Sequence, residues 1–377
     1  MWLFCVYIGS THLLHIPGHG WPVRIDDEEP GRRGVDMEHD IKVGAEETQA
    51  ALLNQAQKLA GSACKHYELE GADVEFIGFS EHATYRIRTA GEDKHLLRIH
   101  LDERSQAEIQ SELLFLEALQ GVEGIHAPSG VPDRNGETVI ELRTDDGNAS
   151  SYITLMKWVD GQPAEGRLTD RQVHNIGKLL RSLHQAGEQF VPPSGFIRPH
   201  WGRQSFDMAM TRLSRYYSSF LTKPDWRLYG QAAAKIQTEL AGMKKDRHSY
   251  GLIHADLHIG NIVFDEDDPR PIDFGRCGSG YFLYDTAAIL LALGPEQRRD
   301  LLRAYDEARE VRQDEVRKLE CFFIMTMMEN YSHHAPNPLE WEGMRAEQPY
   351  ALAYIQAFLK GESFLFRKLE PVRRQDH

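Results

Sequence analysis

The segment YGLIHADLHIGNIVFDEDDPRPIDFG, residues 250–275, constrains the fold of this 377-residue chain more than any other. Its alternating apolar and polar runs predict a polar loop, a strand from Asn261 to Phe264, a turn made by DEDDP and a second strand ending at Asp273. A hairpin of this kind would bring Asn261 and Asp273 close together.

A carboxylate and a carboxamide oxygen near one point suit Mg²⁺, which prefers hard oxygen ligands and is usually completed by substrate phosphates. Asp256, five residues before Asn261, could accept a proton from an attacking hydroxyl. A base, a metal and a phosphate together describe phosphoryl transfer. The alternative is a zinc or iron site made by His254, Asp256 and His258, which would leave Asn261 and IDFG unexplained.

HADLHIGN together with PIDFG resembles the catalytic and metal-binding loops of the aminoglycoside phosphotransferase and choline kinase family. These are small-molecule kinases with a protein-kinase-like fold, and the resemblance covers roughly residues 70–365. It implies ATP and Mg²⁺ as cofactors. By this match Asp256 is the catalytic aspartate that orients and deprotonates the acceptor hydroxyl, and Asn261 and Asp273 are the two Mg²⁺ ligands.

Three further residues are expected to support this loop. His254 matches the leading histidine of the motif, and His258 fits a common variant of it; a substrate contact is the alternative for His258. Asp285 lies in the otherwise apolar run GYFLYDTAAILLAL, where a buried carboxylate needs hydrogen-bond donors. The resemblance implies that Asp285 braces the backbone of the catalytic loop.

The segment IGFSEHATYRI resembles the strand, turn and strand that cover the nucleotide phosphates in this family. It suggests Gly78 and Ser80 as phosphate contacts, with a plain hairpin turn as the alternative. Arg98, in HLLRIH, stands where the family has a lysine, and the two cations are not interchangeable. Glu112 falls within the apolar face of the helix that the capping pair Ser105 and Glu108 opens, and we expect it to pair with Arg98.

The segment TLMKWVDG resembles the hinge between the two lobes, where backbone groups read adenine. The Lys157 carbonyl and the Val159 N–H would face the adenine edge, and Met156 would line the pocket. The alternative is a linker of the same shape that binds no ligand.

The chain length predicts two lobes, and the texture of the sequence changes from strands to helices after residue 165. We therefore expect an α+β, two-lobed protein-kinase-like fold, with a small N-lobe built on an antiparallel sheet and a larger, mostly helical C-lobe. The predicted boundaries are an unstructured lead-in over 1–45, the N-lobe over 46–156, the hinge over 157–161 and the C-lobe over 162–377.

Within these lobes, Thr169 is expected to cap one helix and Gly187 to end it. The remaining predicted elements are strands in 74–89, 94–101, 136–144 and 151–159, and helices over 46–60, 105–121, 204–222, 227–244, 280–293, 296–309, 314–331 and 349–366.

The composition excludes several classes of protein. A net charge of −14 argues against a general nucleic-acid binder, which holds phosphates with clustered Lys and Arg. The four cysteines lack CxxC spacing, so we expect neither a zinc site nor disulfides, and a reducing cytoplasm. The opening MWLFCVYIG lacks a basic flank and is too short to span a bilayer, so no membrane partner is expected.

The sequence thus predicts a cytoplasmic ATP- and Mg²⁺-dependent kinase that phosphorylates a hydroxyl of an aminoglycoside-, choline- or amino-alcohol-like small molecule. One alternative is a protein Ser/Thr kinase of the bacterial stress-response type, disfavoured because no APE-like segment follows Gly275. Another is a nucleotide-binding pseudokinase. Arg98 favours it, and so does the scarcity of glycine in IGFSEHATYRI, where Gly78 is the one glycine. PHWGR, residues 199–203, and NPLEWEG, residues 337–343, are candidates for the acceptor pocket, and His333 and His334 are expected at the surface. Oligomeric state leaves no signal in the sequence.

Overall fold

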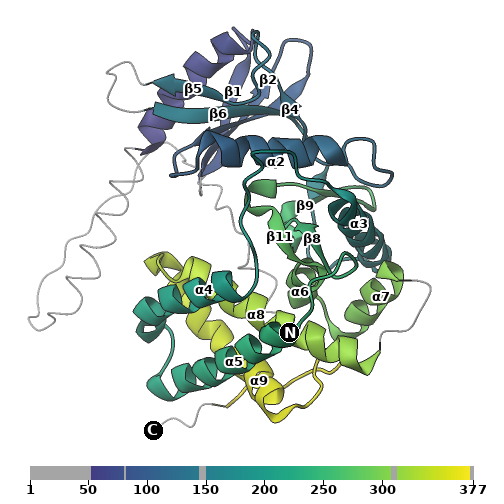
Figure 1. Ribbon diagram of the computed structural model, residues 1–377. Helices are drawn as coiled ribbons and strands as arrows, with labels where there is room; N and C mark the ends of the chain where they lie inside the picture. Colours follow the sequence, from purple (N-terminus) through teal and green to yellow (C-terminus); the bar gives the residue numbers. More distant parts are fainter. Residues whose placement is uncertain (1–51, 80–81, 144–149, 307–311, 374–377) are drawn as a thin grey trace, which may run out of the picture. The chain divides into compact units, whose positions relative to one another are not determined.

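The structure is a computed structural model that describes residues 52–79, 82–143, 150–306 and 312–373 (Figure 1). The predicted lead-in over residues 1–45 and Ser80 lie outside these ranges. The described chain forms two compact units. We call residues 52–106 with 130–158 the sheet unit, and residues 107–129 with 159–373 the helical unit. The chain passes between the units at Gln106/Ala107 and Ser129/Gly130 and a last time between Trp158 and Val159, which lie in the range 157–161.

The sheet unit holds an antiparallel sheet with the strand order β1-β2-β3-β6-β4, in which β5 also pairs with β6. Successive side chains along each strand point to opposite faces of the sheet. The strands are β1 (Asp73–Phe79), β2 (His82–Arg88), β3 (Lys94–His100), β4 (Gly130–Val131), β5 (Ile140–Arg143) and β6 (Ser150–Lys157).

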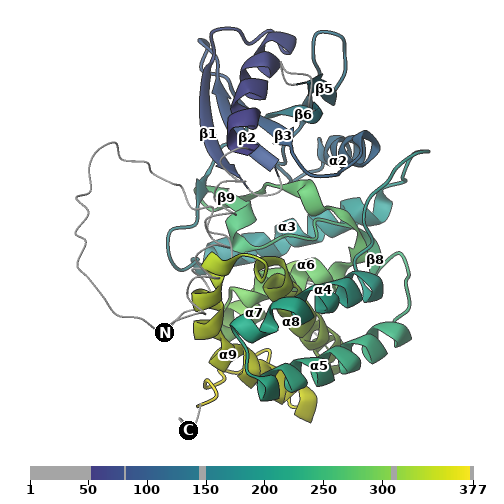
Figure 2. The same ribbon diagram turned by 90° about the vertical axis from the view of Figure 1, so that its left-hand side faces the viewer.

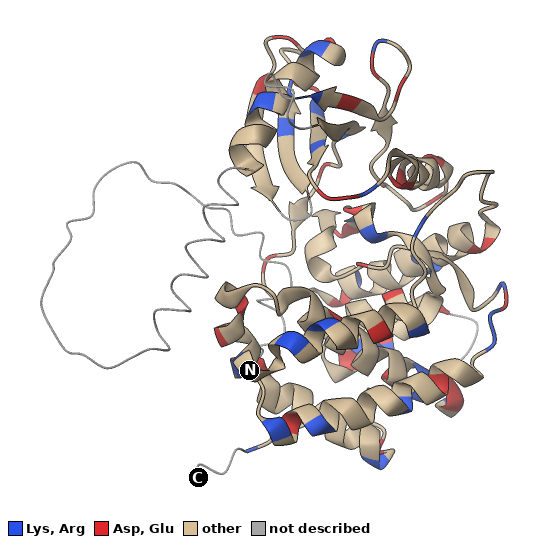
Figure 3. Cartoon of the chain, turned by 60° about the vertical axis from the view of Figure 1, so that its left-hand side comes forward, with Lys and Arg blue, Asp and Glu red and all other residues tan. Residues whose placement is uncertain are grey.

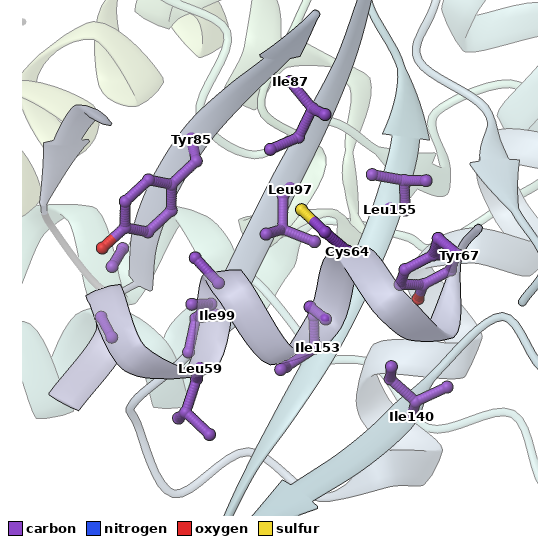
Figure 4. Close-up of a cluster of buried hydrophobic side chains, with 14 residues drawn as sticks. Leu59, Cys64, Tyr67, Tyr85, Ile87, Leu97, Ile99, Ile140, Ile153 and Leu155 are labelled. Atoms are coloured by element: carbon purple, nitrogen blue, oxygen red, sulfur yellow. The ribbon is translucent and has the colours of Figure 1, made fainter. Parts of the chain in front are cut away.

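A helix over residues 52–66 covers one face of this sheet (Figure 4). Tyr85, Leu97 and Leu155 are register partners across β2, β3 and β6, and all three are buried in the same cluster as Leu59 and Cys64 of the helix. Because side chains alternate along a strand, the residues between these positions lie on the opposite face of the sheet. Arg98 is one of them.

The helical unit is built around α8 (Gln313–His334), which packs against α4, α5, α6 and α9 (Figures 1 and 2). Two short antiparallel sheets, β10-β9-β7 and β11-β8, carry the segment from 250 to 281. The other elements are α2 (Gln106–Leu119), α3 (Asp170–Gln189), α4 (Arg203–Tyr216), α5 (Lys223–Gly242), α6 (Phe282–Leu291), α7 (Pro295–Tyr305), α9 (Trp341–Lys360), β7 (Gln162–Pro163), β8 (Tyr250–Ile253), β9 (Ile262–Asp265), β10 (Asp268–Pro271) and β11 (Gly278–Tyr281).

Acidic and basic residues are interspersed along both units (Figure 3). Within the described ranges, no helix combines the length and the apolar character needed to cross a bilayer.

Helix α3 begins as predicted, with Thr169 and Gln172 forming a capping box, but the prediction that Gly187 ends it is wrong. The helix continues to Gln189, and Gly187 lies inside it. A Cβ atom at this position would lie 1.9 Å from the Leu252 carbonyl oxygen. The glycine is therefore required by the close approach of α3 to β8, the strand that leads into HADLHIGN.

Gly187→Ala should lower the free energy of unfolding by about 1–3 kcal/mol or more, because the added methyl group must displace the β8 backbone. The matched control is Gly230→Ala in α5, where a Cβ would meet no atom within 4 Å. That change should raise stability by up to about 1 kcal/mol through helix propensity. Urea unfolding of both variants measures the difference, and equal effects would contradict the packing argument.

Candidate active site

Asn261 and Asp273 lie at the open end of a β-hairpin. Strands β9 and β10 pair antiparallel, with Ile262 opposite Pro271. The Ile272 N–H donates to the Asn261 carbonyl at 2.9 Å, which extends the pairing by one step. The structure thus brings residue 261 beside 272 and 273, the proximity that the apolar and polar pattern predicted.

Asp256 is held in the loop by Asn261. The Asn261 Nδ2 group donates to the Asp256 carbonyl at 2.9 Å and to the Asp256 Oδ2 atom at 3.2 Å. Backbone bonds from the His258 N–H to the Asp256 carbonyl and from the Asn261 N–H to the His258 carbonyl tighten the same turn. Because its amide nitrogen is engaged in this way, Asn261 presents its carbonyl oxygen as the end that can coordinate a cation.

His254 ties the two motifs together. Its Nε2 atom lies 3.0 Å from the Ile272 carbonyl oxygen, and its Nδ1 atom accepts a hydrogen bond from the Asp256 N–H at 3.3 Å. These partners require the neutral Nε2–H tautomer, since a carbonyl only accepts and an N–H only donates. Both ring nitrogens therefore serve the loop backbone, which argues against the zinc or iron alternative.

Asp285, in the first turn of α6, is fully buried and accepts hydrogen bonds from two backbone groups. The His254 N–H lies 2.8 Å from Oδ2, and the Ala255 N–H lies 2.7 Å from Oδ1. Ala255 has φ = 62°, a left-handed conformation that costs a non-glycine residue roughly 1–2 kcal/mol. The Asp285 carboxylate therefore holds HADLHIGN in a strained shape.

Asp273 also adopts a left-handed conformation, with φ = 63°. The next residue, Phe274, is buried against the rings of His254 and Phe115, at centroid distances of 4.3 and 6.2 Å. Non-glycine residues with strained backbone persist only where the surrounding structure holds them in place, and they are concentrated at functional sites. The turn at Asp273 is thus anchored on its C-terminal side by packing.

His258 lies close to both aspartates. Burial lowers the pKa of His258, while Asp256 and Asp273 act in the opposite direction. The imidazole is accordingly neutral at pH 7. Among the described residues its Nδ1 atom has no hydrogen-bond partner.

A second group of side chains in the helical unit lies near Asp256 or contacts its neighbours, and sequence reasoning missed most of it. Arg276 stacks on the Trp201 ring, with its Cζ atom 4.5 Å from the ring centroid, and the Trp201 Nε1–H donates to the Arg276 carbonyl at 3.0 Å. Trp201 belongs to the PHWGR segment that was suggested for the acceptor pocket. Arg276 directly follows IDFG, a position that the motif alone did not single out.

The histidine pair at the end of α8 belongs to the same neighbourhood. The side chain of His333 is exposed, as predicted, and that of His334 is partly buried. Partial loss of solvation lowers the pKa of His333, Arg276 and His334 act in the same direction, and Asp256 opposes them. The pKa of His334 is lowered too, mainly by burial. Over the described part of the chain, no group of three or more His, Cys, Asp or Glu side chains could hold a metal ion by itself.

In the sheet unit, four residues form one row across four strands. Gly78 is the register partner of Thr84, Thr84 of Arg98, and Arg98 of Thr154. Met156 follows Thr154 by two residues in β6 and so shares the face with Arg98, opposite the helix over 52–66. Lys157, the last residue of β6, is exposed, and Val159 is partly buried.

Glu112 lies on the buried face of α2, as its spacing predicted. The cation placed beside it within the helical unit is Arg198, whose Nη1 atom lies 4.0 Å from Glu112 Oε2. The pairing of Glu112 with Arg98 stays a prediction. Arg198 was not singled out by the sequence, because its partners lie 79 residues later in the chain, at Cys277, and 90 residues earlier, at Glu108.

A model of the phosphotransferase enzyme family matches residues 73–318, well over half of the chain. The chain belongs to this family. The range includes HADLHIGN, IDFG, Asp285 and the β-strands of the sheet unit, so the family match covers both halves of the predicted site.

Two proteins share about a quarter of their residues with this chain over the aligned region. An uncharacterized protein, sll1119, of Synechocystis sp. is 27% identical over 231 residues, which are 60% of this chain and 62% of that protein. Amicoumacin kinase of Bacillus subtilis is 25% identical over 259 residues, 68% of this chain and 71% of the relative. The chain thus spans somewhat less than two thirds of the first relative.

Solved structures show the fold of the family. The microcompartment-associated aminopropanol kinase has a TM-score of 0.68 at 23% identity, covering 81% of this chain and 99% of that one. The amicoumacin kinase hAmiN, in complex with AMP-PNP, Ca²⁺ and Ami, has a TM-score of 0.67 at 18% identity, covering 84% and 96%. The predicted α+β, kinase-like fold is confirmed.

A buried glutamate, Glu329, should make the stability of this protein depend on pH. Glu329 in α8 accepts hydrogen bonds from the Tyr284 hydroxyl and, at 3.5 Å, from the Ser205 hydroxyl. Burial raises the pKa of Glu329 from 4.5 to about 7. The native state therefore keeps a proton that the unfolded chain releases near pH 4.5, and the associated stability is lost as the pH rises toward 7.

Glu329→Gln should remove this dependence, because the amide is neutral at every pH. Relative to the wild type, its free energy of unfolding should rise between pH 5 and pH 8 by up to about 3 kcal/mol. Urea unfolding across this range measures the difference, with the exposed Glu342→Gln in α9 as the control. A constant difference between Glu329→Gln and wild type would contradict the raised pKa.

Proposed function

We propose that the protein transfers the γ-phosphoryl group of ATP, in the presence of Mg²⁺, to a hydroxyl group of a small molecule. The observation that supports this most is the joint placement of Asp256, Asn261 and Asp273. One loop and one hairpin end hold a carboxylate, a carboxamide and a second carboxylate within one neighbourhood, and Asn261 contacts Asp256 directly. Family membership gives the arrangement its chemical context.

In this reaction the acceptor oxygen attacks the γ-phosphorus, and the bond from that phosphorus to the oxygen bridging the β-phosphate breaks. ADP leaves with this oxygen, and the hydroxyl proton passes to the Asp256 carboxylate. The hydrogen bond from Asn261 Nδ2 to Oδ2 fixes the orientation of that carboxylate, which aligns the acceptor.

The residues present fit Mg²⁺ by their chemistry, since Asn261 and Asp273 supply hard oxygen atoms from positions that hydrogen bonds and packing fix. They would hold the metal, which would neutralise charge on the transferred phosphate. Two protein ligands are sufficient, because Mg²⁺ usually completes its coordination shell with water and phosphate oxygens.

For the nucleotide we propose the face of the sheet that carries Arg98 and Met156. Arg98 would hold the phosphates, together with Gly78 and Ser80, and Met156 would contact adenine. The Lys157 carbonyl and Val159 N–H would read the adenine edge, and Glu112 would pair with Arg98. The row of register partners from Gly78 to Thr154 supports a common role for these residues.

The acceptor is proposed to be an amino-alcohol-like or aminoglycoside-like compound, bound near Trp201, His333 and His334. Two relatives are named as kinases of amicoumacin and aminopropanol, both small molecules. The cytoplasm, which supplies ATP, is the proposed location, and we propose no nucleic-acid or membrane partner.

One observation favours a second candidate, a pseudokinase that binds a nucleotide and regulates. Arg98 occupies the position where the resemblance places lysine, and a guanidinium differs from an ammonium group in shape and hydration. Turnover separates the two functions, because a pseudokinase would bind ATP without consuming it.

ATP consumption by the purified protein in Mg²⁺, measured against a panel of amino alcohols, aminoglycosides and sugars, tests the main proposal. Asp256→Asn should lower kcat by at least about 100-fold while ATP binding persists, because the amide cannot accept the proton. The control Asp314→Asn changes an exposed aspartate of α8 and should retain full activity. Tight ATP binding without turnover of any acceptor would support the pseudokinase instead.

Asp273→Ala should weaken nucleotide binding at least about tenfold in Mg²⁺ and leave it nearly unchanged in EDTA, because the variant lacks a metal ligand. Calorimetric titration with a non-hydrolysable ATP analogue under both conditions measures this. An equal loss with and without the metal would mean that Asp273 acts on the fold or on the nucleotide itself.

A further inference from the structure

Arg198 lies in the connection between α3 and α4, is almost fully buried, and contacts two distant segments at once. On one side it donates to the carbonyls of Cys277 at 2.6 Å, Gly275 at 2.5 Å and Phe274 at 3.4 Å. On the other side it donates to the Glu108 carbonyl of α2 at 3.1 Å and lies 4.0 Å from the Glu112 carboxylate.

The neighbours of Arg198 follow the same path. The Ile197 N–H donates to the Ser111 hydroxyl of α2 at 2.8 Å. Beyond Arg198, the Ser279 N–H donates to the Pro199 carbonyl at 2.9 Å, and the Trp201 N–H donates to the Ser279 carbonyl at 2.8 Å. Residues 197–201 thus run between α2 and the segment 274–279 and bind both. We call residues 197–201 the clasp.

We propose that Arg198 is a positioning residue, which through the clasp fastens α2 to the segment after Asp273 and so fixes the turn that presents Asp273. This rests on the proposed function in one respect only, the role of Asp273 as a metal ligand. The short helical turn Phe274–Arg276 directly follows Asp273, and Arg198 binds the carbonyls of two of its residues.

Arg198 satisfies several buried backbone carbonyls at once. The carbonyls at 274, 275 and 277 converge on one guanidinium, whose planar fork donates in several directions. Without it, these buried carbonyls would lose a charged donor, and a turn with Asp273 at φ = 63° would gain freedom to relax. Lysine carries the same charge but cannot span this set, because its donors radiate from one atom.

The clasp binds α2 to the rest of the helical unit, with which residues 107–119 are grouped. Glu112, the predicted partner of the phosphate-binding Arg98, is held by the same arginine that sets the turn at Asp273. Both positions therefore depend on one buried side chain, and a change at Arg198 should disturb them together.

The test uses Arg198→Met, which keeps bulk but removes every donor, and Arg198→Lys, which keeps the charge. Arg227→Met, at an exposed position of α5, is the control. Hydrogen exchange of the whole protein is measured at residues 107–119 and 274–279, together with kcat, the KM for ATP and the Mg²⁺ concentration for half-maximal activity.

In Arg198→Met we expect exchange to accelerate at least tenfold in both segments, the Mg²⁺ requirement to rise at least tenfold, and kcat to fall more than the KM for ATP rises. Arg198→Lys should be intermediate, and it decides the outcome if Arg198→Met does not fold. Acceleration in only one segment, uniform acceleration over the helical unit, or an unchanged Mg²⁺ requirement in an active enzyme would overturn the proposal. A wild type without phosphotransfer refutes the proposed function alone, since hydrogen exchange still decides on the clasp.

Discussion

A single buried carboxylate determines the shape of the catalytic loop. Asp285 accepts the N–H groups of His254 and Ala255, and the latter residue is left-handed. Hydrogen bonds to a charged group contribute about 1.5–3 kcal/mol each, which exceeds the roughly 1–2 kcal/mol that a left-handed alanine costs. His254 and Asn261 then hold the backbone of Asp256 just after this bend, because His254 Nδ1 accepts the Asp256 N–H and Asn261 Nδ2 donates to the Asp256 carbonyl.

The helical unit uses the same device elsewhere. Glu320 accepts the N–H groups of Phe364 and Leu365, and Arg298 donates to the carbonyls of Leu290 and Leu365, all in buried surroundings. Arg198 does so for the turn after Asp273. A buried charge is costly unless its bonds are satisfied, so each such group accepts few arrangements of the backbone around it. These buried charged groups thereby hold irregular segments of the unit, which lack regular secondary structure, in a single conformation.

The sequence predicted what local patterns encode. The hairpin after HADLHIGN, the helix opened by Thr169 and the buried face of Glu112 all follow from periodicity, capping and turn chemistry. It did not predict what depends on distant contacts. A glycine near the end of a helical pattern, such as Gly187, is typical of a helix C-terminus. Here the glycine is needed because β8 packs closely against α3, and the sequence around Gly187 does not encode that contact. Arg198, Arg276 and Glu329 were missed for the same reason, since their partners come from other elements.

The placement of α2 in the helical unit has a consequence for biosynthesis. The sheet unit is interrupted in the chain: β1 to β3 come before α2, whereas β6, which pairs with β3, β4 and β5, comes after it. The ribosome therefore releases a three-stranded sheet that lacks its central partner, then a helix whose own partners, Arg198 and the turn after Asp273, are not yet made. Neither unit can complete itself during early synthesis, and the chain must keep β3 unpaired on one edge until residue 157 has emerged. Exposed strand edges of this kind are where chains associate wrongly, so a slow stretch of synthesis after β6 would favour correct pairing.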